Sequence, residues 1–361
     1  MGKGNRIARC GRRLGDLIWG LPGYAKAVLA ALIFGSTEGS VKSLLDHMSL
    51  DTYLLARASI AFAMLLVWMQ WRARGDFYRT GLNPRSVRPL AWLRGLAFVT
   101  CTVMMTIGLV KNHNQMFAYA TFLIHPAVTL LLMQLKKNER GSFLQLVGPL
   151  AITVVSAVAY ALHGWQHGGV WDMMLWYVAP AIGGICFAGE NALSGEMDRW
   201  YQYDALEVTF YTAFPTLVFT LVICAGICGW NHGACMRLDM QNWEDLEAIL
   251  KLIAFSLVAP FAAVLLNDAF ANAMPEQKPG MAALDLLILP YAAVVGLFTH
   301  SVTFFYENPK VPALWSGDGV LLLFILIGAV ATVCVIEKIK LKTKQDGKTV
   351  SVPVSDSRAP D

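Results

Sequence analysis

The chain has 361 residues, of which 56% are hydrophobic and 15% are charged, and its mean hydropathy is +0.50. A chain this apolar is not an ordinary soluble domain, and its composition predicts an integral membrane protein. The formal net charge of +4 at pH 7 is explained below by membrane topology, so we expect no nucleic-acid partner.

The chain begins with a basic segment, residues 1–23, that contains MGKGNRIARCGRRLGD. The apolar run after it is long and interrupted by polar residues, and no A-x-A-like cleavage site follows it. We therefore expect no removable signal peptide. At the other end, residues 338–361 are polar and contain prolines, which is typical of a disordered tail.

Long apolar runs occupy most of the chain between these two segments. A membrane-spanning helix needs about 20 mostly apolar residues. This criterion predicts ten spans, at residues 24–45, 52–71, 90–110, 114–135, 143–162, 173–195, 204–228, 247–271, 281–303 and 317–337. The runs are too long for the strands of a membrane barrel and lack their alternating pattern. We therefore expect an all-α membrane protein.

Lysine and arginine are unequally divided between the two sides of the predicted bundle. One side carries both basic terminal segments and the Arg-rich loop after the second span, whereas the other carries only Lys111, Arg237 and Lys310. Because positive charge gathers on the cytoplasmic side, both termini are expected in the cytoplasm. We expect a multi-pass protein of the cell inner membrane, with the lipid bilayer as its surroundings.

The seven cysteines show no spacing typical of a zinc or haem site. Only Cys224, Cys228 and Cys235 lie close together in the sequence. A bridge between Cys228 and Cys235 is one interpretation, and free thiols that pack as small hydrophobic side chains are the other. No metal site or cofactor is expected.

The two halves of the chain resemble each other. FGSTE at 34–38 matches FAGE at 187–190, and the segment 124–140 matches 288–308. The repeats are expected at 24–162 and 173–337, with an outer linker at 163–172. Because each repeat has five spans, an odd number, the second must be inverted in the membrane relative to the first. Such repeats are common in secondary transporters.

Three motifs resemble the drug/metabolite transporter superfamily, in its ten-helix EamA-like branch. They are the first span ALIFGSTEGSVK, the second span YLLARASIAFAMLLVW, and HPAVTLLLMQLKKNERGSFLQLVG across spans four and five. The resemblance implies a basket of ten helices with a substrate cavity lined by spans one to four and six to nine. Spans five and ten would be peripheral, and a homodimer, if one forms, is expected to use them.

Charged residues inside the first two spans are the leading site candidates. A rise of 1.5 Å per residue places Glu38 about 21 Å from the inner surface. Arg57, in the returning helix, is expected about 8 Å from the outer surface, which is nearly the same depth in a core about 30 Å thick. Lys42 lies one turn after Glu38 and is a second partner. These groups either bind and couple substrate or only form a neutral network that fixes helix packing.

The second half supplies Glu190 and Tyr211 at the matching positions. Tyr211 falls opposite Arg57 in the repeat alignment, so Glu190 is expected to lack a matching base and to be the more easily protonated of the two glutamates.

His125 lies near the middle of the fourth span. Its titration range suits a proton relay, and a bond to a backbone carbonyl freed by Pro126 is the equally weighted alternative. Tyr119 and Phe122 either form an aromatic wall for a cation or pack only. The inward vestibule is expected to be lined by Asp285, Asn267 and Asp268, and an interfacial, solvated position is the alternative. Three further residues are expected to act as hinge or packing positions: Gly35, Pro126 and Pro290.

These features predict a secondary active transporter for a small polar or zwitterionic metabolite, such as an amino acid or an amine-bearing nucleoside. The small molecule is its expected partner, and a proton is a second candidate. The main alternative is a proton-driven exporter of drugs or metabolites. A membrane enzyme is less favoured, since the sequence shows no nucleophile and base or metal-ligand spacing. The sequence contains no P-loop motif, so it does not support ATP-driven transport by this chain alone.

Overall fold

The computed structural model describes residues 18–39, 41–72, 88–111, 170–230 and 243–273, with short pieces at 121–122, 124–125, 128–129, 131–132 and 284. These residues are almost entirely helical. The helices are α2 (Gly23–Gly39), α3 (Val41–His47), α4 (Leu50–Arg72), α6 (Pro89–Lys111), α10 (Val170–Tyr201), α11 (Ala205–Trp230) and α12 (Trp243–Ala271).

Four of the described helices are long and apolar enough to cross a membrane. They cover Leu50–Arg72, Pro89–Leu109, Ala205–Gly229 and Asp245–Ala271, and Gly23–Thr37 is a shorter apolar helix. The prediction of an all-α, multi-pass membrane protein is thereby confirmed at this level. Predicted spans five and ten, and with them the proposed dimer surface, lie outside the described residues.

The helix bounds follow local signals in the sequence. Pro89 begins α6, because its fixed φ suits the first turn and its missing N–H is not needed there. Asp204 caps α11: its Oδ1 accepts the N–H groups of Leu206 and Glu207, both at 3.0 Å, and Glu207 Oε2 accepts the Asp204 N–H at 3.0 Å. This is a reciprocal capping box. Gln202, with φ of 54°, makes the tight turn from α10 into α11.

The expected first span at 24–45 is covered by two described helices, because α2 ends at Gly39 and α3 begins at Val41. Ser40, between them, lies outside the described residues.

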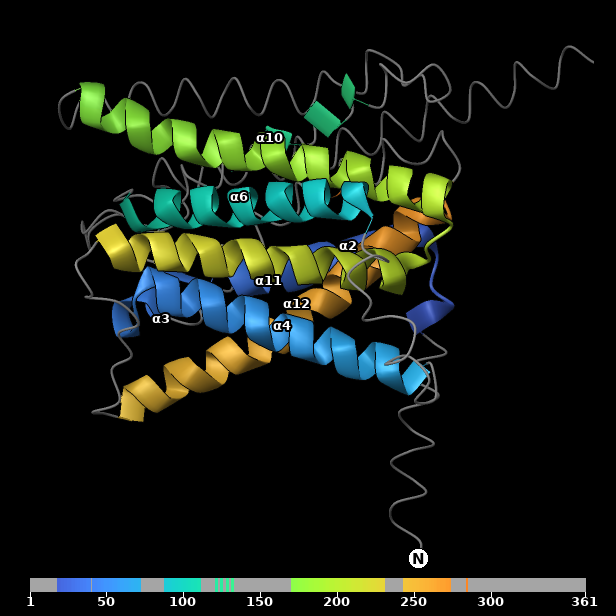
Figure 1. The fold of residues 1–361 in the computed structure, drawn as a ribbon, viewed down its shortest axis with the longest axis horizontal. Coiled ribbons are helices and arrows are strands. Elements are labelled where there is room, and N and C mark those ends of the chain that lie inside the picture. The colour runs from blue at the N-terminus through green and yellow to red at the C-terminus, as the bar shows by residue number, and fades with distance from the viewer. Residues whose placement is uncertain are drawn as a thin grey trace, which may run out of the picture.

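The long helices lie roughly along one axis of the molecule, and long helices that follow one another in the described chain run in opposite directions (Figure 1). Helix α10 packs mainly on α6, α11 packs on α4 and α6, and α12 packs on α2 and α4. The starts of α2, α6 and α11 therefore meet the ends of α4, α10 and α12 at one end of the bundle (Figure 1). Positive-inside topology predicts that this is the cytoplasmic end, and we call it the inner end.

Close approach of α6 to α10 depends on glycine. A Cβ built on Gly108 would lie 2.3 Å from Pro180 Cγ, and one built on Gly183 of α10 would lie 3.2 Å from the Cys101 carbonyl oxygen of α6. Alanines 27, 30, 262 and 269 play a similar part in the buried cluster between α2 and α12. Small residues at these contacts allow the backbones to approach, as in other membrane bundles.

Candidate functional site

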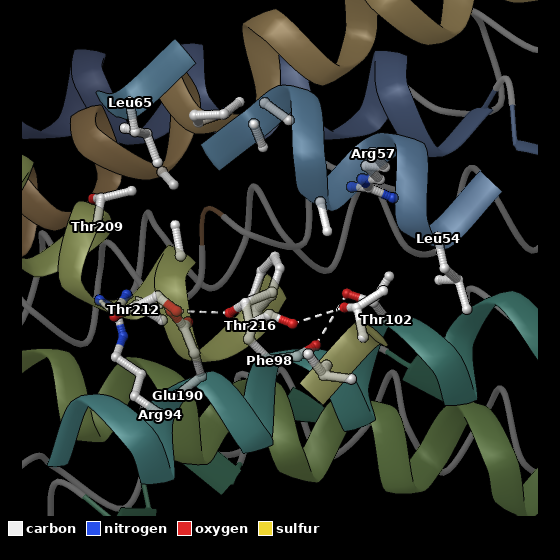
Figure 2. Close-up of a pocket in the computed structure, with 18 of the residues that line it drawn as sticks. Leu54, Arg57, Leu65, Arg94, Phe98, Thr102, Glu190, Thr209, Thr212 and Thr216 are labelled. Carbon is white, nitrogen blue, oxygen red and sulfur yellow. Dashed lines mark hydrogen bonds and ion pairs between the residues drawn. The ribbon is translucent and has the colours of Figure 1, made fainter. Parts of the chain in front are cut away.

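A cavity lies among six of the described helices. The cavity volume is about 100 Å³, which is smaller than the roughly 300–1,000 Å³ of pockets that enclose drug-sized ligands. Helices α4, α6, α11 and α12 supply most of the wall, Phe34 comes from α2, and Glu190 comes from α10. Figure 2 shows Arg94, Glu190 and Thr212 near one end of the cavity, and Arg57, Leu54 and Thr102 toward the other.

A buried ion pair occupies the first end. Arg94 of α6 is 2% exposed and Glu190 of α10 is 6% exposed, and Arg94 Nη2 donates to Glu190 Oε1. Two charges this far from water carry a large desolvation cost, which close pairing and further hydrogen bonds must offset. Hydrogen bonds from the surrounding helices are therefore needed to offset the desolvation cost of the pair.

Arg94 also donates hydrogen bonds to three residues on two more helices. Nη1 donates to the Val208 carbonyl at 3.2 Å and to Thr212 Oγ1 at 3.0 Å, and Nη2 also donates to Asn267 Oδ1 at 3.2 Å. Arg94 Nε has no hydrogen-bond partner among the described residues. One guanidinium thus links α6, α10, α11 and α12.

Asn267 is the second centre of this network. Its Oδ1 accepts the Ser194 hydroxyl at 2.7 Å, and its Nδ2 donates to Thr209 Oγ1 at 2.9 Å. Asn267 is 7% exposed. Both ends of its amide are therefore satisfied within the protein, and the amide orientation is fixed by its partners.

Arg57 lines the cavity farther along α4. Its Nη1 donates to the Tyr53 hydroxyl at 2.7 Å, and its Cζ lies 5.9 Å from the centre of the Tyr53 ring. The guanidinium is half-buried. The cavity thus holds two guanidinium groups and one carboxylate among the described residues that line it.

Two of the sequence candidates, Arg57 and Glu190, are brought to one cavity. The expectation that Glu190 lacks a base is wrong, because Arg94 of α6 pairs with it. The position equivalent to Arg57 in the second repeat lies on α11, where Tyr211 stands. The base comes from a different helix.

Tyr211 is not among the described residues that line the cavity. It lies in the buried cluster between α4, α10 and α11, and its ring stacks on Tyr203 with centroids 4.8 Å apart. The helical repeat explains this position, because Thr209 and Thr212 of the same helix face the cavity and Tyr211 is rotated away from both.

His125 and Phe122 pack together away from the cavity. His125 is fully buried, its Nδ1 lies 3.2 Å from the Phe122 carbonyl oxygen, and its ring centre is 4.9 Å from those of both Phe122 and Phe187. Neither residue is among the described cavity-lining residues. The bond to a backbone carbonyl is therefore the interpretation that the structure favours for His125.

Most of the remaining candidate residues lie, wholly or by their side chains, outside the described part of the chain. Gly35 is buried within α2. Glu38 lies in α2 and Lys42 in α3, and their side chains are outside the described part. The same holds for the whole of Tyr119, Pro126, Asp285 and Pro290.

The cysteine alternatives are partly resolved. Cys101, Cys186 and Cys224 are free. Cys228 is disulfide-bonded, and Cys235, the partner that the sequence suggests, lies outside the described residues.

Sequence reasoning missed Arg94 and the cavity threonines, and it predicted Asn267 only as a lining residue of the inward vestibule. Arg94 stands in PLAWLRGLAFV, so the criterion of a charge inside an apolar span would have found it. No comparable signal marks the threonines, because uncharged polar residues are common in membrane helices and often only pack.

The sequence matches no protein-family model and no curated protein. The chain superposes on the crystal structure of another protein with a TM-score of 0.56. The superposition covers 87% of this chain and 97% of that chain, at 13% sequence identity. This similarity shows that the two chains share a fold over most of their lengths.

Proposed function

We propose that the protein is a secondary active transporter of the cell inner membrane that moves a small polar or zwitterionic metabolite by alternating access. The observation that carries the proposal is the buried Arg94 and Glu190 pair at one end of a cavity enclosed by apolar helices. Charged groups inside a membrane bundle are costly and commonly mark a substrate or ion pathway.

Helix packing supports the two inverted five-helix repeats that this mechanism uses. In the proposed numbering, α2 is span one, α4 two, α6 three, α10 six, α11 seven and α12 eight. In such a repeat, spans one, two and three correspond to spans six, seven and eight. The contact of α2 with α12 then corresponds to that of α10 with α6. Likewise, the contact of α11 with α6 corresponds to that of α4 with α12. All of these contacts are present, and α4 also packs on α11, the pair that would lie on the axis.

The charges in the cavity support a substrate of mixed polarity. A carboxylate at Glu190 and guanidinium groups at Arg94 and Arg57 can face both an ammonium and a carboxylate of one ligand. An amino-acid-like metabolite or an amine-bearing nucleoside meets this description. It is also the substrate class that the sequence predicts from the mixed charges inside its apolar spans.

The test is flux into proteoliposomes that contain the purified protein. A panel of amino acids, nucleosides and amines is first screened for compounds that raise the melting temperature, and radiolabelled hits are then assayed for uptake. Glu190→Gln should reduce uptake by about tenfold to a hundredfold, because a charged hydrogen-bond partner is lost.

The matched control is Glu196→Gln on the same helix. The Glu196 carboxylate accepts the Trp200 indole N–H at 2.7 Å and is not among the described cavity-lining residues, so uptake should be retained. Uptake that is equal in Glu190→Gln and the parent protein would overturn the role of the pair. The proton is the candidate coupling ion. An uptake rate that does not change with an imposed pH gradient would reject proton coupling.

A further inference from the structure

We propose that a row of threonines on α11, together with Thr102 of α6, forms a hydrogen-bond-acceptor track that selects substrates rich in amine or hydroxyl donors. This inference rests on the proposed function and specifies its substrate class. The row consists of Thr209, Thr212, Thr216 and Thr220, and all four line the cavity. At 1.5 Å per residue the row extends about 16 Å, which is roughly half of a membrane core.

Each threonine hydroxyl of the track donates a hydrogen bond to a backbone carbonyl of its own helix. The four α11 hydroxyls donate to the carbonyls four residues earlier, at 2.7, 2.7, 2.8 and 2.8 Å. Thr102 donates to the Phe98 carbonyl at 3.0 Å in the same way. A hydroxyl has one proton and two lone pairs. The oxygens on this wall can therefore accept hydrogen bonds from a guest without losing a bond, whereas donation to a guest would cost the bond to the carbonyl.

The inner two threonines show that the row accepts nitrogen donors. Thr209 Oγ1 accepts an amide N–H of Asn267, and Thr212 Oγ1 accepts an N–H of Arg94. Thr216 and Thr220 have the same rotamer-fixing bond and the same face of the helix, one and two turns farther along. Figure 2 shows Thr216 between Thr212 and Thr102 along the cavity. A ligand N–H or O–H beside Thr216 or Thr220 would complete the series.

The bonds that the threonines already make also determine which groups bind less well. A carboxylate or phosphate can be bound only by a hydroxyl that gives up its bond to the helix carbonyl, so an anionic group gains less along α11 than at the guanidinium groups of the cavity. The substrate class is therefore a small amine or polyhydroxyl compound, with at most one anionic group. Dicarboxylates and inorganic phosphate fall outside it.

The first test measures the melting temperature of purified protein with two sets of probes. The donor-rich set is serine, ethanolamine, putrescine, adenosine and glycerol, and the donor-poor anionic set is succinate and inorganic phosphate. We expect at least one donor-rich probe to raise the melting temperature and neither anion to do so. A shift with an anion alone, or with no probe at all, would overturn the inference.

The second test removes acceptors without changing shape. Thr216→Val and Thr220→Val should each weaken binding of the donor-rich probe by about threefold to tenfold, as expected for one hydrogen bond. Thr100→Val is the matched control, because Thr100 of α6 donates to the Leu96 carbonyl at 2.8 Å and is not among the described cavity-lining residues. Equal affinity in the parent and both cavity variants would refute the track.

The two proposals fail separately in these experiments. Threonine-dependent binding without flux into proteoliposomes would support the track and reject transport. Flux of a donor-rich probe that both valine variants leave unchanged would support transport and reject the track.

Discussion

The single residue with the greatest effect on this site is Arg94. Its guanidinium holds Glu190, Thr212 and Asn267, which come from three different helices. A neutral residue at this position would leave the Glu190 carboxylate buried without a countercharge. In a bundle surrounded by lipid, water cannot take over that role.

Arg94→Met should therefore lower the stability of the protein in detergent by about 3–5 kcal/mol, the usual cost of removing one partner from a buried pair. The double variant Arg94→Met with Glu190→Gln should recover part of that loss, because no ionised group then remains unpaired. Thermal unfolding of the parent, both single variants and the double variant gives the coupling between the two residues. A double variant no more stable than Arg94→Met would contradict the explanation.

Asp204 combines a helix cap with an ion pair at the inner end of the bundle. Its carboxylate pairs with Arg72 and accepts two backbone N–H groups of α11. Burial raises the pKa of Asp204, but the bonds from Arg72, Glu207 and Leu206 outweigh it, and the net pKa lies below the ordinary value of 3.8.

A lowered pKa in the folded state means that this stabilisation is complete above pH 3.8 and is lost as the pH falls through the folded pKa. Asp204→Asn should keep the cap, change stability little at pH 7, and weaken the acid dependence below about pH 4. Asp204→Ala should lose about 1 kcal/mol at pH 7 through the missing cap. Melting temperatures of the three proteins between pH 3 and 7 check both statements, and identical acid profiles for parent and Asn variant would refute the linkage.

At the scale of helices, the contact between α6 and α10 depends on the absence of one side chain. Gly108 faces Pro180, and a Cβ there would lie 2.3 Å from Cγ and 2.9 Å from Cδ of the proline ring. A proline ring cannot move aside as a flexible side chain can. Any larger residue at 108 must therefore separate the two helices that carry Arg94 and Glu190.

Gly108→Ala should lower the melting temperature and also reduce substrate uptake, since it disturbs the ion pair farther along the same helices. Gly189→Ala on α10 is the control, because a Cβ there meets nothing within 4 Å. Alanine has the higher helix propensity, by up to about 1 kcal/mol, so the control should be neutral or stabilising. Equal melting temperatures for the two variants would contradict the close contact.

At the scale of the whole molecule, ion pairs connect the two proposed halves at the inner end, and a hydrogen bond connects them at the opposite end. At the inner end Lys26 of α2 pairs with Asp268 of α12 at 2.5 Å, and Arg72 pairs with Asp204. At the opposite end His47 Nδ1 lies 2.7 Å from Asp245 Oδ1. Alternating access would require the inner pairs to separate when the cavity opens toward that end.

Lys26→Gln should therefore favour opening of the inner end. Hydrogen exchange should become faster in the last turns of α12 and the first turns of α2 and α11, because the inner contacts open more often. The charge swap Lys26→Asp with Asp268→Lys should slow exchange again by restoring a pair. Exchange rates that stay unchanged in the single variant would show that this pair does not hold the inner end closed.

The sequence by itself determined the membrane class, the helical fold and most bounds of the described helices to within a few residues. Span length, hydropathy and capping signals are local properties, so Pro89, Asp204 and the apolar runs carry that information in the chain. The ten spans and their inverted repeat remain predictions that the packing of the described helices supports.

Only the tertiary structure decided which polar side chains meet. A membrane helix is apolar toward lipid and apolar toward its neighbours, so hydropathy alone does not show which face turns inward. That is why Arg94 was missed as the partner of Glu190, and why Tyr211 and His125 were placed beside a cavity that they do not line among the described residues. The rotation of each helix is fixed by contacts between distant segments, such as Gly108 with Pro180, and those contacts arise only in the folded bundle.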